Sequence, residues 1–219
     1  MAYLAGVPKE YVSDNKELND MLKIPCDSDQ EAEKILRGLG VKDEKIIFVN
    51  INASDLCIER RWPTDCFSIL IKQLLKLHDT VVILIGSDKE WEYNQKCIDQ
   101  ITVQLPGENK VHNIAGRSSL SVFLALLKIG DLLVTNDSGP MHLGALMGCP
   151  IVSLWGPGTP QSYAPQSTNH IVIYHSVYCS PCLYMINERP CGGDNICMRS
   201  ITPQEVFEAC VQALAGRKE

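Results

Sequence analysis

Short, almost continuous apolar runs alternate along this chain with segments that carry a helical pattern of apolar residues. The runs have the length of strands and lie at 45–51, 80–86, 111–114, 131–135, 150–155 and 171–175. Runs with so little polar alternation are typical of strands that are covered on both faces, and therefore of parallel sheets. The sequence thus predicts an α/β fold in which a parallel sheet has helices on both faces.

The intervening segments are predicted to be helices, at 28–40, 63–78, 87–101, 118–130, from 139 onward and 202–216. Ser28 and Thr202 are expected to be N-caps, and Pro63 is expected to stand in a first turn. Residues 52–62, between the first strand and the second of these helices, are expected to form a loop.

Polar and glycine residues gather in the loops that follow the predicted strands, at 50–62, 86–91, 115–118, 136–142 and 156–160. In parallel α/β sheets, ligands bind outside the carboxyl ends of the strands. The sequence therefore predicts a single ligand cleft at that edge of the sheet.

The segment NDSGPMHLGALMG, residues 136–148, follows an apolar strand and begins a helix. The N-terminus of a helix has unpaired N–H groups and a positive dipole end, which suits a phosphate. A simpler interpretation is that Asp137 or Ser138 only caps the helix. Gly139, which allows close approach to the backbone, and His142, in the first turn, favour the phosphate site.

Composition excludes several classes of protein. A chain of 219 residues suits one α/β domain or two small ones. The net charge of −6 does not favour nucleic acid or an anionic membrane as the main partner. No apolar run approaches the roughly 20 residues of a membrane span, and the N-terminus lacks the features of a secretory signal. A cytoplasmic protein is expected, with a peripheral position at the inner membrane left open.

Several motifs of the chain occur in the order in which one enzyme family has them. They are NAS and RRWP (52–54 and 60–63), LIGS with a later Glu90, NIAGRSSL (113–120), NDSGPMHLGALMG (136–148) and LWGPGTP (154–160). In these motifs the chain resembles the C-terminal half of ADP-heptose:lipopolysaccharide heptosyltransferases, the family 9 glycosyltransferases. The DSGPMH piece is the most specific of them.

The resemblance implies a Rossmann-like domain that forms one half of a GT-B glycosyltransferase. Residues 1–26 have weak periodicity and are expected to be a linker or arm, which leaves residues 27–219 as the nucleotide-sugar-binding domain. The implied reaction is inverting and metal-independent and uses no cofactor. A sugar passes from a nucleotide-diphosphate donor, similar to ADP-heptose, to a lipopolysaccharide, glycan or lipid-linked acceptor. The acceptor and the catalytic base would belong to the other, N-terminal half, so no catalytic residue is assigned in this chain and the isolated domain is expected to be inactive.

The resemblance, together with the positions of polar residues after the predicted strands, predicts a donor-binding role for ten residues. They are Asn52, Ser54, Arg60, Glu90, Gly116, Asp137, Ser138, Gly139, Met141 and His142. Ser138 and the N–H groups near Gly139 and Met141 are expected to hold the diphosphate.

Each charged or polar residue expected near that diphosphate has a binding role and a simpler interpretation that involves no ligand. Arg60 is expected to clamp phosphate oxygens, the alternative being a solvated loop charge; Arg61 is expected to lie at the surface. Glu90 is expected to accept ribose hydroxyls or, equally, to complement a helix dipole, with Glu92 as a competing ribose ligand. Asn52 and Ser54 are expected to reach a phosphate or sugar hydroxyl, or to form a simple turn.

Ten cysteines are many for a chain of this length. Five of them, Cys57, Cys66, Cys97, Cys149 and Cys210, stand singly in apolar or helical segments and are expected to be small buried hydrophobes. The other notable group is Cys179, Cys182, Cys191 and Cys197, for which a structural role is favoured and tetrahedral zinc or redox chemistry is the alternative. Two further function classes therefore stay open: a zinc or redox protein centred on this quartet, and a non-catalytic nucleotide-binding module.

Overall fold

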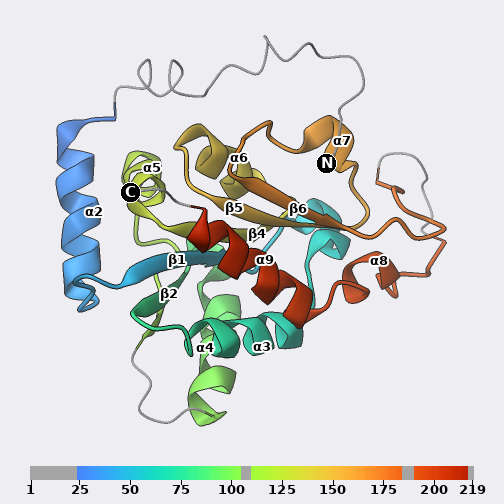
Figure 1. Ribbon diagram of the computed structural model, residues 1–219, viewed down its shortest axis with the longest axis horizontal. Coiled ribbons are helices and arrows are strands. Elements are labelled where there is room, and N and C mark those ends of the chain that lie inside the picture. The colour runs from blue at the N-terminus through green and yellow to red at the C-terminus, as the bar shows by residue number, and fades with distance from the viewer. Residues whose placement is uncertain (1–23, 105–109, 184–189, 217–219) are drawn as a thin grey trace.

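Six parallel strands form one sheet in the computed structural model, which describes residues 24–104, 110–183 and 190–216. The strands are β1 (Lys45–Asn50), β2 (Thr80–Leu84), β3 (Val111–Asn113), β4 (Leu132–Asn136), β5 (Ile151–Trp155) and β6 (His170–Tyr174). Their order across the sheet is β3-β2-β1-β4-β5-β6 (Figure 1). Phe48 of β1 is in register with Ile83 of β2 and Leu133 of β4.

Helices cover both faces of this sheet. One face carries α3 (Thr64–Leu74), α4 (Trp91–Gln104) and α9 (Pro203–Ala215), and the other carries α2 (Cys26–Gly38), α5 (Leu120–Ile129) and α6 (Gly139–Leu146). Figure 1 shows α9 (red) crossing in front of the sheet and α2 (blue) at its left end. Short helices complete the described chain: η2 (Asp55–Arg60), η3 (Asp88–Glu90), α7 (Pro160–Tyr163) and α8 (Ile196–Arg199). The predicted α/β fold with helices on both faces is confirmed.

The strands supply apolar side chains to two separate cores, one on each face. In β1, Ile47 and Val49 pack into the core under α3, α4 and α9, while Ile46 and Phe48 pack into the core under α2, α5 and α6. Successive side chains of a strand point to opposite faces, so a continuous apolar run is needed to fill both cores. Trp155, the last residue of β5, is fully buried.

Three local predictions are corrected. Ser28 lies inside α2 and is buried, because the helix begins two residues earlier at Cys26 after Pro25. Pro63 precedes α3 rather than lying in its first turn, and its fixed φ gives the extended N-cap residue before Thr64. Within the expected loop 52–62, Asp55–Arg60 forms the 3-10 helix η2.

The two ends of the domain are predicted to be an N-terminal arm and a C-terminal capped helix. Residues 1–23 of the predicted arm lie outside the described residues, and α2 already begins at Cys26. Thr202 caps α9 as expected, its hydroxyl accepting from the Glu205 N–H at 3.2 Å. In the described parts of the chain, no helix combines the length and apolarity that a membrane span requires.

The strand order has one point at which successive connections change direction. From β1 the chain winds outward to β2 and β3, and then returns to place β4 on the other side of β1. The loops after β1 and β4 therefore diverge onto opposite faces of the sheet and leave a crevice at their carboxyl ends. A ligand site is expected there before any side chain is considered.

His170, at the start of β6, is held in a neutral state by its neighbours. Its Nδ1 lies 3.0 Å from the Pro165 carbonyl, which can only accept, so this nitrogen carries the hydrogen. The Ser153 hydroxyl accepts from Trp155 Nε1 at 2.7 Å and donates to His170 Nε2 at 2.6 Å. Burial lowers the pKa of His170 below its ordinary value.

This arrangement predicts an acid-dependent loss of stability. The unfolded chain binds a proton at His170 more readily than the folded chain does. The stabilisation is therefore complete above the unfolded pKa of about 6.5 and is lost as the pH falls toward the lower folded pKa. We expect the urea midpoint to fall between about pH 7.5 and about pH 5, and to fall less in His170→Gln. The same slope in both proteins would contradict a neutral, half-buried His170.

Candidate functional site

A cleft of about 350 Å³ opens at the carboxyl ends of β1, β2, β3 and β4. Its volume lies at the lower end of the range of small-molecule sites, roughly 300–1,000 Å³. The lining residues are Asn50, Asn52, Ala53, Ser54, Ile85, Gly86, Ser87, Glu90, Ile114, Ser118, Ser119, Leu120, Phe123, Ser138, Gly139 and Pro140. The cleft therefore lies at the crevice that the strand order creates, and five of the ten predicted donor-binding residues line it.

Asparagine side chains form a hydrogen-bonded row beneath this cleft. Asn136 Nδ2 donates to the Asn52 carbonyl at 3.2 Å, and Asn52 Nδ2 donates to Asn94 Oδ1 at 2.8 Å. Asn94 Nδ2 in turn donates to the Ile85 carbonyl at 3.1 Å, and Asn113 Nδ2 donates to the Trp91 carbonyl at 3.0 Å. The row joins the loops after β1, β2, β3 and β4 into one rigid floor.

Sequence reasoning did not identify this floor, although a signal was present. Asn50, Asn113 and Asn136 are each the last residue of a strand. Polar side chains that close several strands of one parallel sheet lie at the same edge, which is where such folds bind ligands. Asn52 Oδ1 is buried and, among the described residues, has no hydrogen-bond partner.

Ser138 is the N-cap residue of α6, and its hydroxyl belongs to a compact network. Asn50 Nδ2 donates to Ser138 Oγ at 2.8 Å, and Ser138 Oγ donates to the Asn136 carbonyl at 3.1 Å. Thr135 Oγ1 lies 3.1 Å from the same oxygen. Ser138 is thus fixed at the cleft wall with its proton directed toward the backbone of its own loop.

The start of α6 leaves room for a ligand. A Cβ built on Gly139 would meet no protein atom within 4 Å, although Gly139 lines the cleft. The fold itself therefore does not require a glycine here. Met141, by contrast, is fully buried, and its N–H donates to the Ser138 carbonyl at 3.1 Å. The structure thus gives this N–H a partner within the turn.

Arg60 and Asp137 form a loose ion pair beside the cleft. Arg60 Nη1 lies 3.8 Å from Asp137 Oδ2, and the two side chains are only 14% and 11% exposed. Among the described residues, Arg60 Nε is buried without a hydrogen-bond partner. Burial raises the pKa of the Asp137 carboxyl, and the charges of Arg60 and His142 partly oppose this. A guanidinium that is almost buried and underused has donors to spare for an anion.

Glu90 lines the cleft, and its carboxylate is oriented from behind. The Ser87 N–H and the Ser87 hydroxyl both donate to Glu90 Oε2, at 2.7 and 2.9 Å. The helix-capping role is therefore present, and the same bonds fix the carboxylate at the cleft wall. Glu92, the competing candidate, is exposed and is not among the lining residues.

Two other predicted residues, Gly116 and His142, do not line the cleft. Gly116 has φ +71°, and a Cβ there would come within 2.6 Å of Asp88 Cα, so the fold alone requires this glycine. His142 is exposed on α6, close enough for its charge to act on Asp137. The predicted binding roles of both residues stay predictions.

Arg61 differs from the prediction that it lies at the surface. Its side chain is only 22% exposed, because its guanidinium packs against the loop after β1. Two adjacent basic residues suggest a solvated pair of charges. The partner of Arg61 is the backbone carbonyl of Ala53, which the sequence does not mark.

The cysteine quartet does not form a metal cage. All four residues are described, and within the described ranges no group of three or more His, Cys, Asp or Glu side chains is placed to hold a metal ion. Burial raises the pKa of the Cys197 thiol to about 11, with Cys182 and Cys179 acting in the same direction. Backbone N–H groups, chiefly that of Asn195, instead lower the pKa of Cys191. Of the single cysteines, Cys66 is only half-buried, whereas Cys57, Cys97, Cys149 and Cys210 are buried as predicted.

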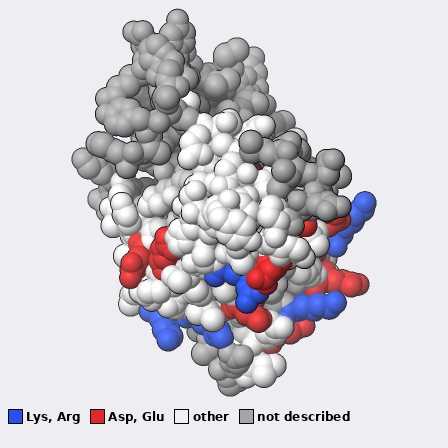
Figure 2. All heavy atoms as spheres, turned by 90° about the vertical axis from the view of Figure 1, so that its right-hand side faces the viewer, with Lys and Arg blue, Asp and Glu red and all other residues white. Residues whose placement is uncertain are grey.

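Charges of both signs are interspersed over the face that lies to the right in Figure 1. Figure 2 shows basic and acidic side chains of the described residues mixed there below a largely uncharged area. A broad positive field would be expected of a protein that binds polyanions nonspecifically. This face therefore has no broad positive field of that kind.

The sequence of this chain matches a family of glycosyltransferases. Residues 5–191 match the sequence profile described as glycosyltransferase family 9 (heptosyltransferase). Lipopolysaccharide heptosyltransferase 2 of Salmonella typhimurium is 32% identical over 156 residues, 68% of this chain and 41% of that protein.

Solved structures match at a similar level. The structure of Escherichia coli ADP-heptose lipopolysaccharide heptosyltransferase II has a TM-score of 0.68 and 28% identity, covering 85% of this chain and 51% of that one. A glycosyl transferase family 9 structure from Veillonella parvula has a TM-score of 0.73 and 26% identity, covering 89% and 53%. The chain thus spans about half the length of the relatives it matches.

Proposed function

Since this chain belongs to glycosyltransferase family 9, the heptosyltransferase family, we propose that it is the donor-binding half of an envelope glycosyltransferase. The donor is a nucleotide-diphosphate sugar, and the acceptor is a lipopolysaccharide or another envelope glycan. A matched structure is named for ADP-heptose, so ADP is the nucleotide proposed here.

One observation carries this proposal more than any other. The cleft at the β1/β4 crevice has open space above Gly139 at the start of α6. Arg60, with a buried Nε that lacks a partner among the described residues, lies 3.8 Å from Asp137, the residue before the cleft-lining Ser138. Helix N-termini and arginine side chains both bind phosphate. A diphosphate would lie over Gly139, and Ser138 would exchange the Asn136 carbonyl for a phosphate oxygen.

The opposite end of the cleft suits a nucleoside. Ile85, Ile114 and Phe123 supply apolar walls for a base, and Glu90 is held in place to accept ribose hydroxyls. Asn52 Oδ1, a buried acceptor that otherwise has no partner in the described structure, would gain a donor from a sugar hydroxyl. An unsatisfied buried acceptor is costly, so a ligand that pairs it gains affinity.

The chemistry follows from what happens to the diphosphate. An acceptor hydroxyl attacks C1 of the donor sugar, the bond from C1 to the phosphate oxygen breaks, and negative charge grows on the departing nucleoside diphosphate. Arg60 and the N-terminus of α6 stabilise that charge, which lowers the barrier directly. Inversion at C1 without a metal, a catalytic base from an N-terminal half, and a peripheral position at the inner membrane remain parts of the proposal.

Nucleotide binding by the chain itself is the direct test. At an ADP concentration of 100 times Kd, binding stabilises the folded state by about 2.7 kcal/mol, which for a domain of this size raises Tm by roughly 5–10 °C. We expect a shift of that size with ADP and a smaller one with adenosine, measured by differential scanning fluorimetry with inorganic phosphate as the control. Equal shifts for ADP and inorganic phosphate, or none with either, would contradict the proposed donor site.

A further inference from the structure

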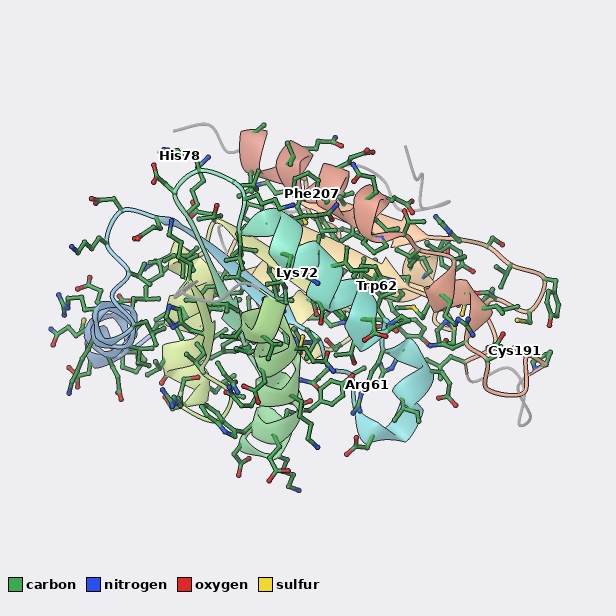
Figure 3. The ribbon with its side chains drawn as sticks, turned by 90° about the horizontal axis from the view of Figure 1, so that it is seen from below. Arg61, Trp62, Lys72, His78, Cys191 and Phe207 are labelled. Atoms are coloured by element: carbon green, nitrogen blue, oxygen red, sulfur yellow. The ribbon has the colours of Figure 1, made fainter. Side chains whose placement is uncertain are left out.

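Arg61 grips the loop that forms one wall of the cleft. Its Nε and Nη2 both donate to the Ala53 carbonyl, at 3.0 and 2.7 Å, and Nη2 also lies 2.7 Å from Asp55 Oδ1. Ala53 and Ser54 line the cleft. Figure 3 shows Arg61 beside η2 and Trp62 farther from η2, nearer α8 and α9.

The same guanidinium ties this wall to two helices. Its central carbon lies 5.5 Å from the centroid of the Tyr93 ring in α4. The Tyr93 hydroxyl in turn lies 2.7 Å from Thr64 Oγ1 at the start of α3. The Arg61 carbonyl also accepts from Asn195 Nδ2 at 3.2 Å. Main chain and side chain of Arg61 are therefore both fixed.

Arg60, one residue earlier, makes few contacts, whereas Arg61 is held by several. Its Nη1 is 3.8 Å from Asp137, and its Nε has no partner within the described structure. The residue after Arg61 is also immobilised, since the Trp62 N–H donates to Asn136 Oδ1 at 3.0 Å. An underused arginine is thus presented from a backbone whose next two residues are held firmly.

We propose that Arg61 is a positioning residue of the donor site, which holds the Ala53–Asp55 wall and the backbone that presents Arg60. It rests on the proposed function, because its effect is exerted on the diphosphate through Arg60. Nε and Nη2 of Arg61 are already engaged by the loop, so the proposed role is to position the loop rather than to contact the phosphate. A lysine cannot replace it, because one ammonium group lacks the planar fork that reaches Ala53 and stacks on Tyr93.

The test is a double-mutant cycle on ADP affinity, measured by isothermal titration calorimetry with the full 219-residue chain. Arg61→Lys and Arg61→Ala are both expected to weaken ADP binding about tenfold, since small displacements of a binding group are costly. In an Arg60→Ala background, Arg61→Ala is expected to cost at most about threefold, because neighbouring residues that act as a unit are not additive. Arg37→Lys, the same chemical change on the exposed side of α2, is the matched control and should leave ADP affinity unchanged.

The outcomes separate the two proposals. Wild-type affinity in Arg61→Lys, or a full tenfold loss from Arg61→Ala in the Arg60→Ala background, would show that Arg61 does not act through Arg60. Failure of the wild-type chain to bind ADP would instead defeat the proposed function and this inference with it. If the Arg61 variants melt too early to titrate, Tyr93→Leu tests the same brace, with Tyr93→Phe as its control; equal ADP affinity in these two variants would overturn the proposal.

Discussion

Arg60→Ala is expected to weaken ADP binding about 10- to 100-fold, the largest effect on affinity of any single substitution in this chain. A hydrogen bond to a charged group contributes about 1.5–3 kcal/mol, and each 1.4 kcal/mol is a factor of about ten. The side chain is 14% exposed and only loosely paired, so little of its capacity is used before a ligand arrives. Titration calorimetry of wild type and variant measures the change directly.

The neighbouring carboxylate supplies the control for this prediction. In Arg60→Ala, Asp137 loses the Arg60 charge beside it, so its carboxylate would also repel the diphosphate. Arg60→Ala combined with Asp137→Asn should therefore recover part of the lost affinity, whereas Arg60→Lys should lose less than Arg60→Ala. Affinity within about twofold of wild type in Arg60→Ala would show that the diphosphate does not reach Arg60.

The fold was predictable because its main requirement, strands that are apolar on both faces, appears in consecutive residues of the sequence. Strands such as 80–84 must be apolar on both faces, and that requirement appears as an unbroken run. Helix ends were less predictable, since they depend on single residues whose partners lie elsewhere. Ser28 shows this: a residue that suits an N-cap is instead buried inside α2.

The candidate site was predictable where one short segment creates it. Ser138 and Gly139 could be located from the strand-to-helix junction that contains them. The strand-end asparagines gave a signal for the position of the asparagine floor, but its hydrogen bonds could not be predicted, because they join residues 42 and 84 positions apart, as in Asn52–Asn94 and Asn52–Asn136. The partial burial of Arg61 was missed for a different reason: its guanidinium binds the backbone carbonyl of Ala53, and every residue has a backbone carbonyl, so the sequence does not mark this partner.

Trp62→Ala is expected to produce the largest loss of stability, about 3–5 kcal/mol, which is the usual cost of removing a large buried aromatic side chain. Trp62 is fully buried and meets Phe67 edge-to-face with ring centroids 4.9 Å apart. Its Nε1 donates to the Ile201 carbonyl at 3.0 Å, which joins the start of α3 to the segment between α8 and α9. Since native domains are stable by about 5–15 kcal/mol, urea unfolding should show a much lower midpoint or loss of the cooperative transition.

Trp62→Phe separates the packing of this side chain from its hydrogen bond and from the donor site. The phenyl ring keeps most of the apolar contact but leaves the Ile201 carbonyl without its donor, so a smaller loss of about 1–3 kcal/mol is expected. The bond from Trp62 to Asn136 uses the main-chain N–H, which survives the substitution, so ADP affinity should change by less than about twofold.

Half-buried Trp91, whose ring stacks on Arg117, is the matched control, and Trp91→Ala should cost less stability than Trp62→Ala. If Trp62→Phe is as stable as wild type, the bond from Trp62 Nε1 to the Ile201 carbonyl does not stabilise the fold. If Trp62→Phe loses ADP affinity as Arg60→Ala does, the backbone around Arg60 is not held by the Trp62 N–H in the way the hydrogen bond to Asn136 indicates.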